Sequence, residues 1–372
     1  ISINYFFINF IKNIEYFFKN LLITMKNFYF FISVLFCNLI ASNDIAIGHA
    51  PIGVMADHFH SSGEKMVSAR FSNMQMNGNA LHGDSINDQS LITTQSNPYA
   101  AMSGAPSMLS IVPQKMNMKM LMLGGMYAPS NDITLMGMLM FMKNEMDLKA
   151  YRGMMGRDFL GGFQTSAEDI SNISFSVLYR LNQSDKSRMH LEIGVDKSIG
   201  DNNRKHKILT PMNTFMNVVM PYAMQNDNST RLIFGLTNSL SFKNLIFGSQ
   251  LRIKTVIDDK VWAFGDKYEI STWVQKSLND NVALSTRLHF INQRKISGRN
   301  IEISGPVQSA NPMNYGGRTM NLGFGFNTLF NLLGGEHRDR FGLEILFPIY
   351  ENKNGLQMKS DYKIQFGYQK SF

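Results

Sequence analysis

The sequence predicts a transmembrane outer-membrane β-barrel of about 12 antiparallel strands, and three observations support this fold class. Residues 362–372 place Tyr362, Ile364, Phe366, Tyr368 and Phe372 on one face of a strand and mostly polar or small residues on the other. The same period of two recurs along the chain in segments of about ten residues, as it does in barrels with lipid outside and water inside. No run past residue 45 reaches the roughly 18 apolar residues of a membrane-spanning helix.

Alternation along the chain predicts the individual strands. They fall near 64–77, 115–127, 132–144, 170–182, 187–199, 229–241, 244–257, 266–277, 281–293, 318–330, 339–350 and 359–372. Tight polar turns are expected at 129–132, 182–187, 242–244, 278–281 and 334–337, and longer connections at 78–114, 145–169, 200–228, 258–265, 294–317 and 351–358. Short turns on one rim and long loops on the other predict short periplasmic turns, long extracellular loops and both chain ends at the periplasmic rim. A soluble β-sandwich is the alternative.

The first 62 residues divide into three predicted segments ahead of the barrel. Residues 1–24, which begin with Ile1, are interpreted as an upstream extension. Residues 25–42 carry Lys26, an apolar core and Ala41-Ser42, the layout of a secretory signal peptide, with a membrane-anchoring helix as the alternative. Residues 43–62 are expected to form a periplasmic entry or plug segment, and residues 63–372 the barrel. An exported barrel of this kind predicts the outer membrane of a Gram-negative bacterium.

Composition narrows the range of partners. Cys37 is the only cysteine, which excludes a disulfide within the chain and a thiolate metal cluster. The net charge of +8 is spread along the chain without a compact basic helix or zinc-finger spacing, which argues against nucleic acid. The expected partners are therefore outer-membrane lipids and small solutes or metal ions, and the sequence leaves the oligomeric state open.

Methionine is concentrated in one third of the chain, between Met55 and Met155. Three predicted strands carry it at alternate positions, and in the first of them Arg70 shares the methionine face, so that this face should point inward. Thioethers favour Cu(I) over hard ions. The predicted metal ligands on this stripe are Met118, Met120, Met136, Met138 and Met140. The alternative is that methionine serves as flexible packing.

A second group of candidate metal ligands precedes the first strand. His49, Asp57, His58 and His60 are ligand types for first-row metals, although their spacing matches no zinc signature. A structural role, in which the histidines bond to the barrel wall, is the alternative. No cofactor is expected, and copper enters only as a possible cargo.

Basic residues on the inward faces of the strands point to a channel. The predicted pore-lining residues are Arg70, Arg180, Arg252, Lys254 and Arg287, expected to face a water-filled lumen. We therefore expect a channel or transporter for small solutes, metal ions such as copper or apolar aromatic compounds. A structural or adhesive barrel that uses its polar loops is the alternative. An enzyme is not expected, since the only plausible pair is His190 with Ser174 or Ser176 and no nucleophile elbow is present.

A set of short motifs carries a family resemblance. They lie at 49–55, 57–60, 116–122, 126–129, 135–142, 221–225 and 265–268. Together they resemble the outer-membrane proteins grouped under "MetA-pathway of phenol degradation", which are regarded as transporters, over about residues 47–372. The resemblance implies an outer-membrane barrel associated with aromatic-compound catabolism in some members and with copper-rich gene neighbourhoods in others. None of the motifs is catalytic.

Overall fold

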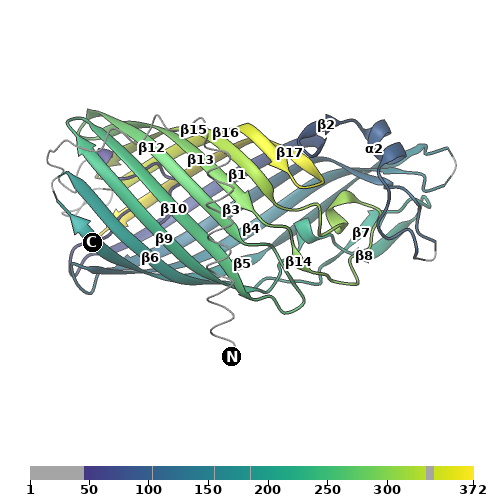
Figure 1. Cartoon of the computed structure of the whole chain (residues 1–372), viewed down its shortest axis with the longest axis horizontal. Coiled ribbons are helices and arrows are strands. Elements are labelled where there is room, and N and C mark those ends of the chain that lie inside the picture. Colours follow the sequence, from purple (N-terminus) through teal and green to yellow (C-terminus); the bar gives the residue numbers. More distant parts are fainter. Residues whose placement is uncertain (1–45, 103, 155, 185, 332–338) are drawn as a thin grey trace.

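Twelve long strands form a closed antiparallel barrel in the computed structural model, which describes residues 46–372 except 103, 155, 185 and 332–338 (Figure 1). The strands are β1 (Lys65–Leu81), β3 (Ile111–Tyr127), β4 (Ile133–Tyr151), β5 (Phe159–Gln183), β6 (Ser187–Ser198), β9 (Thr230–Phe242), β10 (Leu245–Asp258), β12 (Lys267–Asn279), β13 (Val282–Gln293), β15 (Gly317–Phe330), β16 (Asp339–Lys353) and β17 (Leu356–Ser371). The segments interpreted as an upstream extension and a signal peptide lie outside the described residues.

Each barrel strand pairs with its neighbour in sequence, and β17 pairs with β1 to close the ring. The seam runs antiparallel from Met66 opposite Ser371 to Leu81 opposite Leu356, with two irregularities in register. The predicted fold class is therefore confirmed, and the alternative of a β-sandwich is wrong because the sheet closes on itself. No helix among the described residues is long and apolar enough to cross a membrane.

The two rims of the barrel differ. Tight turns join β3 to β4, β5 to β6, β9 to β10 and β12 to β13 at the rim where the C-terminus lies, at the left of Figure 1. The opposite rim carries the small elements β2 (Asp84–Ile86), α2 (Asp88–Thr94), β7 (Lys205–Leu209), β8 (Phe215–Val219), η2 (Tyr222–Met224), β11 (Trp262–Ala263), β14 (Ser297–Gly298) and η3 (Gln308–Ala310). One rim thus has short turns and the other has long connections, as the sequence predicts.

Two of the expected long connections are much shorter in the structure. β4 and β5 extend past the predicted limits, which leaves only 152–158 between them, and β16 and β17 meet at a turn of residues 354–355. The extension of β4 past residue 144 includes charged residues such as Glu145, close to Lys143. On this barrel they remain in the ladder, because their backbone groups pair with β3 and β5 whatever the side chains carry.

The barrel is apolar outside and polar inside. Ile173, Phe175 and Phe324 are about half exposed on the outer surface, whereas Arg287, Arg340 and Glu344 are buried in the interior. This distribution is the reverse of a soluble protein and matches a barrel whose outer face meets lipid.

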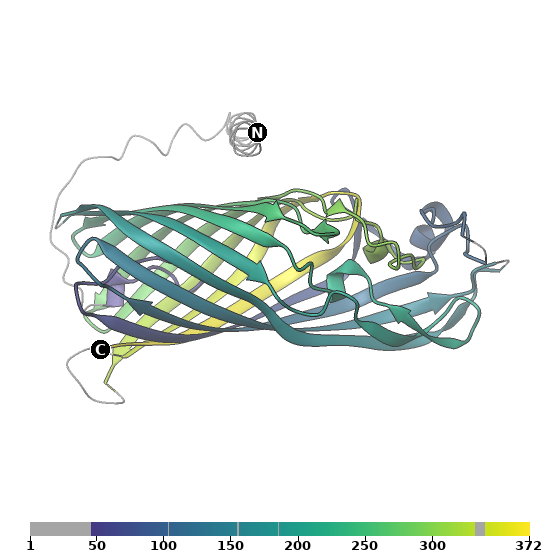
Figure 2. The ribbon, with the colours of Figure 1, turned by 90° about the horizontal axis from the view of Figure 1, so that it is seen from below.

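The segment ahead of β1 enters the barrel. The 3₁₀ turn η1 (Ala46–Gly48) packs against the turn between β12 and β13, where the backbone N–H of Ala46 donates to the carbonyl oxygen of Asp280 at 3.0 Å. The chain then runs into the lumen at the short-turn rim (purple in Figure 2) before β1 begins. We call residues 46–60 the plug segment.

Candidate functional site

Side chains of the barrel wall hold the backbone of the plug segment. Arg70 donates to the carbonyl oxygens of Ile52 and Val54 at 3.0 and 2.9 Å, and Gln250 donates to that of Met55 at 2.7 Å. On other strands, Gln275 reaches the carbonyl of His49 at 2.6 Å, and the Nε2 atom of His190 lies 2.8 Å from that of Ala56. An irregular segment cannot satisfy its own carbonyls, so the wall supplies the missing partners.

Gly53 allows the plug segment to approach the wall closely. A Cβ atom at this position would collide with Gln365, Glu344 and Arg287, which form one hydrogen-bonded group. The absence of a side chain at Gly53 therefore lets the segment lie directly against this group.

Six charged residues on every second strand from β6 to β16 form what we call the ionic wall: Glu192, Asp196, Arg252, Lys254, Arg287 and Glu344. Arg252 binds Glu192 through two hydrogen bonds of 2.8 and 2.9 Å. Arg287 binds Glu344 in the same forked manner, at 2.7 and 2.8 Å. Lys254 lies 2.7 Å from Asp196. Forked arginine–carboxylate pairs fix direction as well as charge, so this wall has a defined geometry.

A glycine between the partners makes one of these pairs possible. Glu192 and Arg252 lie on β6 and β10, and Gly235 of β9 stands opposite both of them in the ladders. A Cβ atom on Gly235 would lie 2.8 Å from the Glu192 carboxylate. Because Gly235 has no side chain, Glu192 and Arg252 can contact each other across β9.

The predicted pore-lining residues all lie on the inner side, but their surroundings differ from the expected open water. Arg252 and Arg287 are buried in ion pairs, Lys254 is bound to Asp196, and Arg70 is bound to the plug segment. Arg180 stacks over the ring of Phe59 at 4.2 Å, in the same segment.

Sequence reasoning missed the carboxylate partners of these residues and also Arg340, which donates to the side chains of Gln369 and Asn327 and to the carbonyl of Ala50. A signal was present. Arg340, Gly342 and Glu344 alternate with the apolar Phe341 and Leu343, which puts the two charged residues on one inward face.

The opposite side of the lumen is what we call the methionine wall, formed by inward residues of β1, β3 and β4. Met66, Met126 and Met136 stand side by side across the three strands, and Arg70, Met122 and Met140 form a parallel row. Residues directly opposite in a ladder share a face, so Arg70, which binds the plug segment, fixes these methionines as inward. Met120, Met122 and Met140 are only partly buried, so the wall offers thioethers to the lumen.

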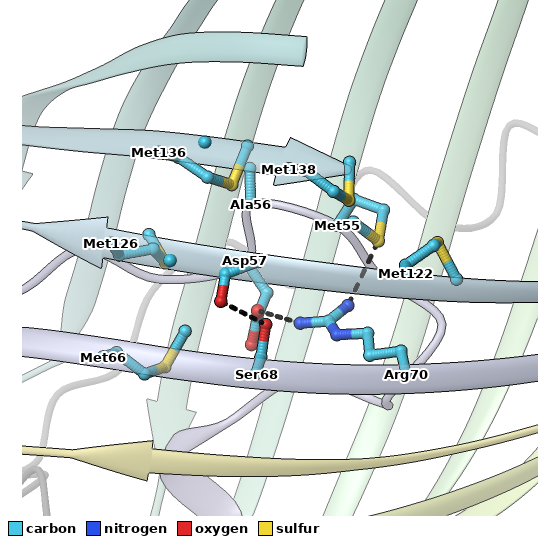
Figure 3. Close-up of a pocket in the computed structure, with 13 residues that line it drawn as sticks. Met55, Ala56, Asp57, Met66, Ser68, Arg70, Met122, Met126, Met136 and Met138 are labelled. Atoms are coloured by element: carbon cyan, nitrogen blue, oxygen red, sulfur yellow. Dashed lines mark hydrogen bonds and ion pairs between the residues drawn. The ribbon is translucent and has the colours of Figure 1, made fainter. Parts of the chain in front are cut away.

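The predicted methionine ligands separate into two groups. Met136 and Met138 line a small pocket together with Met55 of the plug segment and Met122 (Figure 3). Met118, Met120 and Met140 belong to the same wall but do not line this pocket. Inside the pocket, Arg70 lies 3.2 Å from the sulfur of Met55.

The predicted histidine and aspartate ligands come together in the lumen. Ligand atoms of His49, Asp57 and His58 all lie within 4.8 Å of one another. The ring of His58 packs edge-on against those of His49 and His60, with centroids 5.0 and 4.9 Å apart. Burial and the nearby Arg340 hold the pKa of His49 well below its usual value, which keeps the ring neutral.

Asp57 stays ionised within this group. Burial alone would raise the pKa of its carboxyl, but His58, Arg340 and Arg70 together hold it well below the usual range. The two guanidiniums lie 3.8 and 3.9 Å from its oxygens, and the backbone N–H of Ala50 donates to Oδ2 at 3.1 Å.

Neither pairing considered for an enzyme, His190 with Ser174 or with Ser176, forms in the structure. His190 is buried in the lumen and bonded to the plug segment, and Ser176 donates to Glu192 at 2.9 Å. Ser174 stands opposite Asp196 in the β5–β6 ladder, away from His190, which stands opposite Arg180.

Aromatic residues gather at the long-loop end of the lumen. Tyr222, Trp262, Phe264 and Tyr315 contact one another edge-on, with centroids 4.7 to 6.0 Å apart. Met116 and Met146 of the barrel belong to the same apolar cluster. The loops thus fold over the mouth with apolar side chains directed inward.

Comparison with solved structures supports the fold. An outer-membrane channel from Pseudomonas putida F1 is 11% identical, with 86% of this chain and 100% of that chain covered and a TM-score of 0.53. At this identity the likeness shows the fold alone, a closed outer-membrane barrel. The toluene transporter TodX of P. putida overlaps more loosely, at 10% identity, 90% and 99% coverage and a TM-score of 0.43. No family model and no curated protein matches the chain.

Proposed function

We propose that this protein is a channel in the outer membrane of a Gram-negative bacterium and that it passes small apolar solutes, aromatic compounds among them. The methionine wall is the observation that carries the proposal. A lumen that served only ions or sugars would gain nothing from a broad, partly exposed thioether surface, whereas such a surface contacts aromatic rings favourably through sulfur.

The two ends of the lumen fit this function. Apolar solutes would collect at the aromatic cluster of the long-loop rim, which Met116 and Met146 join to the methionine wall. The plug segment stands at the other end and would have to shift for passage. The resemblance to transporters of the phenol-degradation group points the same way, as does the fold shared with the P. putida channel.

Flux into liposomes tests the proposal. Barrels reconstituted in vesicles should admit phenol and benzyl alcohol faster than a sugar of similar mass, measured against empty vesicles. Changing Met120, Met122 and Met140 to Asn should slow the aromatic solutes and leave the sugar unchanged. The variant Met102→Asn, in a long-rim loop, is the matched control. Equal rates for aromatic and sugar, or no flux above empty vesicles, would reject the assignment.

Copper transport is not part of this proposal, because the comparisons lend it no support. Of the five predicted methionine ligands, only Met136 and Met138 line the small pocket, and the other three lie elsewhere on the methionine wall. A Cu(I) or Ag(I) titration of the wild type against a variant with Leu at positions 118, 120, 136, 138 and 140 would test this alternative. Stoichiometric binding by the wild type and its loss in that variant would support the copper alternative.

A further inference from the structure

A cluster of metal-ligand side chains lies inside the lumen, on the plug segment. His49 stands near one end of the plug segment, and Asp57 and His58 near the other. The fold of the segment brings their ligand atoms within 4.8 Å of one another, with the ring of His60 packed on His58. Residues eight and nine positions apart in the chain thus face a common point.

Two ring nitrogens of this cluster, Nδ1 of His49 and Nε2 of His58, are buried and have no hydrogen-bond partner. The other ring nitrogen of His58, Nδ1, lies 3.0 Å from Oδ1 of Asp57, whose side chain is only 1% exposed. Closure of a loop on unpaired polar atoms costs free energy unless something binds them. The Asp57 carboxylate is accounted for by His58, Arg70 and Arg340, but packing alone does not account for the two unpartnered ring nitrogens beside it.

We infer that His49, Asp57 and His58 bind one divalent transition-metal ion of the Zn²⁺ or Cu²⁺ type. Imidazole nitrogen with one carboxylate oxygen is a donor set for these ions, whereas Ca²⁺ and Mg²⁺ require more oxygen ligands than this cluster offers.

Two nearby charges limit the affinity of the site. Arg70 and Arg340 lie 3.8 and 3.9 Å from the Asp57 carboxylate and repel a cation. Both also have other partners, however: Arg70 donates to Ile52 and Val54, and Arg340 to Asn327 and Gln369. We therefore expect moderate affinity, with Cu²⁺ bound more tightly than Zn²⁺ in accordance with the general order of divalent metals.

The metal would join the two ends of the plug segment. His49 would be tied to His58 across the loop whose carbonyls Arg70 and Gln250 hold. A ligand that binds only the docked segment stabilises that state by mass action. The site would therefore make plug docking respond to metal, and the inference stands whether the channel passes aromatic or other solutes.

Calorimetric titration with the metal alone tests the inference. The protein is purified in detergent from outer membranes without a histidine tag, stripped with EDTA and titrated with ZnCl₂ or CuCl₂. Wild type should bind one equivalent, and the variant His49→Gln/His58→Gln should bind at least tenfold more weakly. The variant His206→Gln, in the β7 strand of a long-rim loop, is the control and should bind like wild type.

A second measurement keeps the test valid if the double variant folds poorly. Electron paramagnetic resonance of bound Cu²⁺ should show coupling to two nitrogens in wild type, and one fewer in His49→Gln alone. Asp57→Asn should weaken binding without a change in nitrogen coupling. The absence of binding by wild type, equal binding by the double variant, or a wild-type spectrum without nitrogen coupling would each overturn the assignment.

Discussion

The ionic wall and the methionine wall face each other across one lumen and are built on opposite principles. Each arginine of the ionic wall has one carboxylate partner in forked geometry, and the Arg287–Glu344 pair lies directly against Gly53 of the plug segment. The methionines have no fixed partners, and several remain partly exposed to the lumen. The difference indicates that one side of the barrel holds the structure in place, while the other is left adaptable for a guest.

Removal of one partner from an ion pair of the ionic wall should lower the free energy of unfolding more than any of the other substitutions. Arg287→Met leaves Glu344 buried without its counterion, and such changes cost about 3–5 kcal/mol. The double variant Arg287→Met/Glu344→Met should recover most of the loss, because no lone charge remains. Urea unfolding followed by tryptophan fluorescence measures both variants. If the single and double variants prove equally unstable, the wall acts by packing and not by charge pairing.

The second largest effect is expected from a change at Gly53, where the plug segment contacts the ionic wall. Gly53→Ala inserts a Cβ atom into the space occupied by Gln365, Glu344 and Arg287, and overpacking of this kind costs about 1–3 kcal/mol. The segment should undock and the conductance of single channels in planar bilayers should rise. Gly137→Ala is the control, because its Cβ atom would meet nothing within 4 Å. An unchanged conductance in Gly53→Ala would contradict close docking.

The methionine wall should tolerate substitution far better. Met120→Leu, Met122→Leu and Met140→Leu conserve volume and apolar character, so each should change the free energy of unfolding by less than about 1.5 kcal/mol. The same urea titrations provide the measurement. A loss as large as that of Arg287→Met would mean that the two walls do not differ in the way described.

The smallest effect is expected at the edge of the plug segment. Phe59→Leu removes the ring over which Arg180 stacks, an interaction worth about 0.5–1 kcal/mol. Protection of the segment from protease should fall slightly. Phe71→Leu, on the outward face of β1, should leave that protection unchanged. Equal protection in wild type and Phe59→Leu would show that this contact contributes nothing to docking.

Much of the fold could be predicted from local pattern, because apolar residues at every second position, such as Tyr362, Ile364 and Phe366, identify a strand with one apolar face. The inward direction of the methionines was also within reach, since Arg70 shares their face. The partners of the arginines were not. Glu192 meets Arg252 only because β6, β9 and β10 are neighbours with a particular register, and register is a property of pairing rather than of one strand.

The histidine cluster shows the same limit. His49 and His58 are not at a metal-binding spacing in the sequence, and their approach depends on the path of an aperiodic segment inside the lumen. That path is set by Arg70 of β1 together with Gln250 and Gln275, which come from strands far along the chain. Residue types could suggest candidate ligands there, but only the assembled barrel brings them together.

The seam between β1 and β17 has a consequence for how the protein is made. Because Met66 pairs with Ser371, the ring cannot close until the final residues have been delivered to the membrane. Until then the first and last strands present open edges, which readily pair with other chains. The plug segment touches β10, β12 and β15, all downstream of it, so its binding place exists only late in assembly. Biogenesis therefore has to shelter two unpaired edges and an undocked N-terminal segment until closure.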